Sequence, residues 1–119
     1  MGDTYITVKI YKEIPGEGRE IKLLVDTGAS YSWIPRKILE ELGVKPTRRM
    51  RFKTIEGRII ERDVGHIFVE YEGEVAPTTI VFAEEGDITV FGLHGLESLG
   101  LEVDPVTREV RRSEALLAI

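Results

Sequence analysis

The chain has 119 residues, of which 42% are apolar and 31% charged, and its net charge is −5. This length predicts one globular domain spanning residues 1–119. The acidic balance argues against nucleic acid as a partner, and no apolar run is long enough to cross a membrane or to act as a signal peptide, so we expect a cytoplasmic protein without a membrane partner. The absence of cysteine excludes a disulfide framework, a thiolate nucleophile and a cysteine-based zinc site.

The first part of the chain predicts a β-hairpin. Apolar and polar residues alternate with a period close to two over residues 5–11, which is typical of a strand. Pro15-Gly16-Glu17-Gly18 predicts a turn, and residues 20–25 predict the returning strand.

An unpaired carboxylate ends this returning strand. The apolar run 23–25 is followed directly by Asp26, Thr27 and Gly28. A lone charge at the end of a buried strand is costly unless something compensates it, and glycine lets main-chain N–H groups approach and hydrogen-bond the carboxylate. The other Asp-x-Gly, at Asp63, has neither the hydroxyl residue nor the apolar run. Asp26 is therefore the candidate functional carboxylate, the alternative being an ordinary loop or helix-capping aspartate.

A short apolar strand over residues 31–34 is expected next, followed by a helix over residues 36–42. Pro35 is a favourable residue at the start of a helix, and Gly43 is a natural stop. Residues 44–50 predict a polar connection.

The middle of the chain predicts two further hairpins. Strands over residues 51–54 and 58–62 flank Ile55-Glu56-Gly57, which predicts a hairpin tip. Residues 65–72 and 75–82 predict the second pair.

The last third predicts a buried strand over residues 88–91 that ends at Gly92, a short helix over residues 93–99, and a terminal hairpin from residues 101–103 and 108–111. Many short strands with few helices predict an all-β protein, and we expect a compact closed barrel with one or two short helices.

Three landmarks together resemble the retropepsin-like (retroviral-type) aspartic proteases. They are Asp26-Thr27-Gly28 after an apolar strand, a hairpin centred on Gly57, and Thr89-Val90-Phe91-Gly92 before a short helix. The segment 91–105 is especially similar to cellular and prokaryotic members of the family.

Two positions depart from the retroviral enzymes. Those proteins carry an acidic residue two positions after the loop glycine and an arginine just after the later glycine, and the two residues support each other. Here the positions are Ser30 and Leu93. Because both members of the pair are absent together, the resemblance favours the cellular or prokaryotic branch, and it leaves open how a dimer is held.

The resemblance implies an aspartic endopeptidase in which two identical chains build one site, because each chain supplies one catalytic loop. Asp26 from each chain would share a proton and activate a water that attacks the peptide bond. Thr27 would hydrogen-bond across the dimer axis, and Gly28 would allow the close backbone approach. No metal and no cofactor are required. The wholly apolar run 115–119 is expected to help form the homodimer, with folding onto its own core or disorder as the alternatives.

The resemblance also implies a flap, a hairpin that closes over an extended peptide or protein substrate. Its residues would be Ile55, Glu56, Gly57 and Arg58. Ala29 and Ser30 are the candidate substrate contacts next to the catalytic loop. Four apolar side chains either line substrate pockets or pack in the core: Ile34, Ile55, Ile59 and Val90.

Other chemistries have weaker patterns. His66 and His94 lack the spacing of a metal site, and Ser30 with His94 lacks the surroundings of a catalytic serine. The basic run 48–53 superficially suggests nucleic-acid binding but is more simply a solvated connection or the shoulder of the flap. The remaining alternatives are a catalytically silent dimeric peptide-binding module of the same fold and a protease that acts mainly on itself or on one partner.

Overall fold

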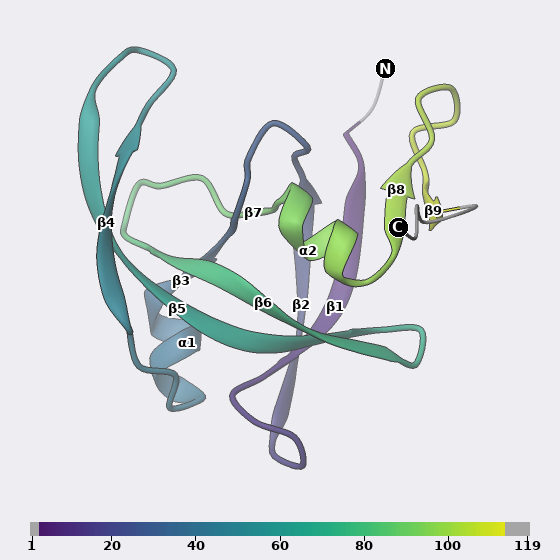
Figure 1. The fold of residues 1–119 in the computed structure, drawn as a ribbon, viewed down its shortest axis with the longest axis horizontal. Helices are drawn as coiled ribbons and strands as arrows, with labels where there is room; N and C mark the ends of the chain where they lie inside the picture. The colour runs from purple at the N-terminus through teal and green to yellow at the C-terminus, as the bar shows by residue number, and fades with distance from the viewer. Residues whose placement is uncertain (1–2, 114–119) are drawn as a thin grey trace, which may run out of the picture.

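The computed structural model describes residues 3–113, which form nine strands and two short helices (Figure 1). In chain order the elements are β1 (Tyr5–Tyr11), β2 (Gly18–Val25), β3 (Ser32–Pro35), α1 (Arg36–Glu41), β4 (Arg48–Lys53), β5 (Ile59–Tyr71), β6 (Glu74–Ala83), β7 (Val90–Phe91), α2 (Leu93–Ser98), β8 (Leu101–Val103) and β9 (Val110–Arg112). Neither helix in this part of the chain is long and apolar enough to span a membrane.

Seven strands form one sheet in the order β1-β2-β7-β3-β6-β5-β4, and β1 also pairs with β5. This additional pairing closes the strands into a ring. Strands β8 and β9 form a separate small hairpin, and the β4–β5 hairpin extends away from the ring (Figure 1). The expected all-β closed barrel with short helices is confirmed.

Side-chain alternation explains the core. In β1 the residues Ile6, Val8 and Ile10 are buried while their neighbours face outward. The largest fully buried side chains are those of Phe82 and Phe91, from two strands that both pair with β3. Burying this apolar surface is the main source of stability, and it holds the short strands β3 and β7 in place.

The predicted strand boundaries were wrong in the middle of the chain. Residues 58–62 and 65–72, predicted as separate strands, form the single strand β5, which pairs first with β4 and then with β6. Gly65 does not break the strand. A Cβ at that position would lie 3.1 Å from the carbonyl oxygen of Lys45, so the glycine accommodates a close backbone crossing.

The predicted polar connection over residues 44–50 also needs correction. Strand β4 begins at Arg48, inside the segment predicted as a connection. The basic run therefore forms a strand of a hairpin, where Arg49 pairs with Glu61 at 3.2 Å and with Asp63 at 3.1 Å. The apolar run 115–119 lies outside the described residues.

Candidate active site

Asp26 directly follows β2, at a point where three strands meet. Strand β7 lies between β2 and β3, pairing in parallel with the first and antiparallel with the second. The loop from Asp26 to Tyr31 must therefore cross the end of β7, and the Asp26 N–H donates to the carbonyl oxygen of Phe91 at 3.0 Å. The position of Asp26 is thus set by two neighbouring strands as well as by its own loop.

The loop turns back on its own carboxylate. The Gly28 N–H donates to Oδ1 of Asp26 at 2.9 Å, and the Ala29 N–H donates to the Asp26 carbonyl oxygen at 3.1 Å. The expected backbone hydrogen bond to the carboxylate is therefore present. In contrast to the expected burial, the Asp26 side chain is exposed in the single chain. Water therefore reaches this carboxylate.

The loop is also fastened to the start of α2. The Leu93 N–H donates to the Ala29 carbonyl oxygen at 2.8 Å, and the His94 N–H donates to that of Ser30 at 3.0 Å. The Gly92 N–H donates to the buried Ser32 hydroxyl at 2.9 Å. Two of these three successive N–H groups thus hold the Asp26 loop against the β7–α2 junction, and the third holds the adjoining start of β3, so the loop is a firm support for its carboxylate.

Asp26 lies at the edge of a groove of about 360 Å³ beneath the tip of the β4–β5 hairpin, which we call the Asp26 groove. Its lining combines apolar side chains with three carboxylates: Asp26, Ala29, Trp33, Thr54, Ile55, Glu56, Ile60, Gly86, Asp87, Ile88 and Val90.

The structure brings together five of the residues predicted from the sequence. The Asp26 groove is lined by Asp26, Ala29, Ile55, Glu56 and Val90, which come from three separate parts of the sequence. Gly57 forms the hairpin turn with φ +91°. The remaining predicted residues, Thr27, Gly28, Ser30 and Arg58, lie outside the lining of this groove.

Part of the groove lining could not be predicted from the sequence because apolar residues stand side by side in it. Ile34 is fully buried in the core, and the neighbouring Trp33 lines the groove instead. Likewise Ile59 is 48% exposed outside the lining, and Ile60 faces the groove. Successive residues of a strand point to opposite faces, so only the pairing register decides which of two adjacent apolar residues faces the groove.

Aromatic contacts join the hairpin to the Asp26 loop. The ring of Phe52 on β4 lies 5.1 Å from that of Trp33 and 6.5 Å from that of Tyr31, both edge to face. Such pairs contribute about 0.5–1.5 kcal/mol beyond the area that they bury. The hairpin, close to its tip, is thus packed against the segment that follows Asp26.

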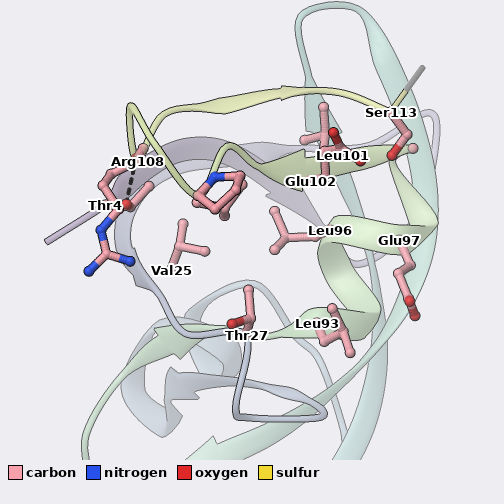
Figure 2. A pocket seen from close by; sticks show the side chains of 13 residues that line it. Thr4, Val25, Thr27, Leu93, Leu96, Glu97, Leu101, Glu102, Arg108 and Ser113 are labelled. Carbon is pink, nitrogen blue, oxygen red and sulfur yellow. Dashed lines mark hydrogen bonds between the residues drawn. The ribbon is translucent and has the colours of Figure 1, made fainter.

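A second groove, of about 590 Å³, lies on the other side of the loop, and we call it the Thr27 groove (Figure 2). Val25, Thr27, Leu93 and Leu96 form one side of it, and residues of the β8–β9 hairpin lie across from them (Figure 2). The Thr4 hydroxyl donates to the Arg108 carbonyl oxygen at 2.6 Å and ties the N-terminal segment to this hairpin. An open groove that combines apolar side chains with the charged residues Glu97, Glu102 and Arg108 therefore begins one residue after the Asp26 carboxylate.

The ring of strands and the crossing loop with its aspartate define a retropepsin-like aspartic protease. The sequence model of the aspartyl protease family matches residues 7–102, and the chain belongs to this family. A similar solved structure is the solution structure of the Simian Foamy Virus (mac) protease, with 19% identity, 77% of this chain and 92% of that chain covered, and a TM-score of 0.48. A search of curated proteins gave no match.

Proposed function

We propose that this protein is an aspartic endopeptidase whose active site is completed by a second copy of the chain. The observation that carries the proposal is the exposed Asp26 carboxylate, held by the Gly28 N–H at 2.9 Å at the edge of the groove beneath the hairpin tip. A carboxylate that is rigidly placed yet open to water is suited to activating a water molecule.

In the proposed mechanism two Asp26 carboxylates face each other across the dimer. Two carboxylates in contact cannot both ionise, so they share one proton at mildly acidic pH. The ionised member removes a proton from the attacking water, and the protonated member polarises the carbonyl group of the substrate. The proton then passes to the leaving nitrogen, so that the peptide bond is broken without a covalent intermediate.

The substrate is proposed to be an extended peptide lying in the Asp26 groove. The side chains of Trp33, Ile60 and Val90 offer apolar contacts, and the hairpin tip with Ile55 and Glu56 would cover the bound peptide and exclude water. Ile55 is fully exposed in the single chain, which is consistent with a surface that substrate or a second copy covers.

The homodimer is proposed because the chemistry needs two carboxylates and the chain has one such loop. The Thr27 groove supports this assignment. It starts next to Asp26, its lining includes several apolar side chains, and Leu93 on its wall is 37% exposed. A second copy that covers this groove would bring its own Thr27 and Asp26 to the same place.

The test is incubation of the wild-type chain with an unstructured protein at mildly acidic pH, with and without a statine-type peptide that mimics the transition state. We expect cleavage that the statine-type peptide inhibits. Binding of that peptide without any cleavage would instead indicate the catalytically silent peptide-binding module. If the chain neither binds the statine-type peptide nor cleaves the protein, both functions are contradicted.

Leu93→Glu is expected to weaken the dimer. A carboxylate at position 93 would add to those of Glu97 and Glu102 in a groove that a second copy covers, and it would have to lose its water there. The dimer dissociation constant should therefore rise about tenfold or more. Sedimentation equilibrium measures the constant, and specific activity should fall on dilution in parallel. Ile14→Glu, at a 46% exposed apolar residue of the β1–β2 turn, is the matched control. An unchanged constant in Leu93→Glu would mean that the interface lies elsewhere.

A further inference from the structure

One wall of the Asp26 groove is the loop between β6 and β7. It contributes Gly86, Asp87 and Ile88 to the lining, and Ile88 is 74% exposed. Within the loop, the Asp87 N–H donates to the Glu84 carbonyl oxygen at 2.9 Å, and Oδ2 of Asp87 accepts from the Glu84 N–H at 2.8 Å. These two bonds define the turn but do not fix its distance from the rest of the groove.

That distance is set by an ion pair with Arg62 on β5. Arg62 donates from Nε to Oδ2 of Asp87 at 2.7 Å and from Nη2 to Oδ1 at 2.9 Å. The two side chains are only 19% and 13% exposed. A two-pronged bond between partly buried charges is stronger and more directional than an exposed ion pair.

Arg62 belongs to the base of the hairpin that covers the groove, since it pairs with Met50 across β4 and β5. The Arg62–Asp87 pair therefore spans from this hairpin to the opposite wall.

A second set of ion pairs holds the other end of the loop, and we call it and the Arg62–Asp87 pair the two tethers of the loop. Arg36 on α1 donates from Nε and Nη2 to Oε2 of Glu84, at 2.9 and 2.7 Å, and Nη2 also reaches Asp63 at 2.6 Å. Because Asp63 lies on β5 next to Arg62, both tethers end on the same strand. With Arg36 in place, loss of Arg62 would release mainly the end of the loop that carries Asp87 and Ile88.

We propose that Arg62 and Asp87 are positioning residues that hold the groove wall at substrate-binding distance from the covering hairpin. The inference rests on the proposed function. Without Arg62, the Asp87 carboxylate would be left partly buried with no cation beside it and only the hydrogen bond from the Glu84 N–H, and its move toward water would carry Ile88 away from the groove. The Asp26 loop is held by other bonds, to Phe91 and to the start of α2. Loss of the pair should therefore weaken substrate binding and leave the rate of the chemical step largely unchanged.

The pair also suits an enzyme working at mildly acidic pH. The hydrogen bonds from Arg62 and from the Glu84 N–H hold the pKa of the Asp87 carboxyl below its ordinary value of 3.8. A lowered pKa in the folded state means that the contribution of Asp87 to stability is present above its ordinary value and is lost only as the pH falls through the lower one. The wall therefore stays tethered at the pH where two carboxylates would share a proton.

The test compares Arg62→Gln, Asp87→Asn and the double variant with wild type, by kcat and KM on one peptide substrate. We expect KM to rise about tenfold in each single variant with kcat changed less than about threefold, and no further rise in the double variant. Tenfold corresponds to about 1.4 kcal/mol, the size expected for a hydrogen bond to a charged group. Arg62→Lys, which keeps the charge but loses the two-pronged geometry, should give a smaller rise in KM.

The control is Arg19→Gln, which removes an exposed ion pair with Glu41 outside the groove lining. It should leave KM unchanged. Unchanged KM in Arg62→Gln and Asp87→Asn, even with a lower melting temperature, would overturn the proposal and reduce the pair to a structural role. If Arg62→Gln does not fold, the KM values of Arg62→Lys and Asp87→Asn test the proposal in its place. If wild type cleaves nothing, the proposed function fails. The positioning role of Arg62 and Asp87 is then tested by the affinity of the same variants for the statine-type peptide.

Discussion

Asp26→Asn is expected to abolish peptide cleavage, with kcat falling about a thousandfold or more, because an amide can neither remove a proton from water nor return it to the leaving nitrogen. The fold should persist. The asparagine oxygen can still accept the hydrogen bond from the Gly28 N–H, which now lies at 2.9 Å from Oδ1. The Asp26 side chain is exposed, so no buried packing is lost.

The measurement is the initial rate of peptide cleavage by the variant and by wild type, with circular dichroism and sedimentation to verify fold and dimer. Asp63→Asn is the matched control, because Asp63 begins the other Asp-x-Gly of the chain. Its carboxylate pairs with Arg36 at 2.6 Å and with Arg49 at 3.1 Å, so its loss should lower stability and leave kcat close to wild type. Wild-type rates in Asp26→Asn would refute the assignment of the catalytic residue.

Gly92→Ala is also expected to have a large effect, on both stability and cleavage rate, and steric overlap alone is the cause. The backbone at Gly92 has φ −90° and ψ 179°, which any residue adopts. A Cβ there, however, would lie 2.4 Å from the Tyr31 carbonyl oxygen and 2.8 Å from that of Ala29. Both obstacles are backbone atoms of the segment that carries Asp26, so no side-chain rotation can relieve the overlap.

The Asp26 loop must therefore move away from β7 in Gly92→Ala. We expect the free energy of unfolding to fall by about 2–4 kcal/mol. The rate of cleavage should fall about a hundredfold, because a small displacement of a catalytic group is enough to have that effect. Denaturant unfolding and kcat measure the two changes.

Gly73→Ala separates this overlap from the ordinary effect of removing a glycine. Gly73 has φ +85°, with nothing within 4 Å of an added Cβ, so only the backbone conformation is disfavoured, at about 1–2 kcal/mol, with activity unchanged. Equal stability and equal activity of the two variants would show that the loop and the β7–α2 junction are not as tightly joined as their hydrogen bonds indicate.

Several features of this protein could be predicted because they depend on residues close together in the sequence. The period-two pattern of β1 and the turn at Gly57, with φ +91°, follow from local preferences. So does the hydrogen bond from Gly28 to the carboxylate two residues before it. The sequence by itself thus determined the all-β class, the hairpin tip and the candidate carboxylate.

The tertiary structure decided what depends on distant partners. Arg62 and Asp87 are 25 residues apart and Ser32 and Gly92 are 60 apart, and no local pattern links either pair. The sequence also left open which of two adjacent apolar residues faces the groove, as with Trp33. Period-two alternation gives two faces to a strand, but only its pairing with neighbouring strands decides which face meets the core and which meets the groove.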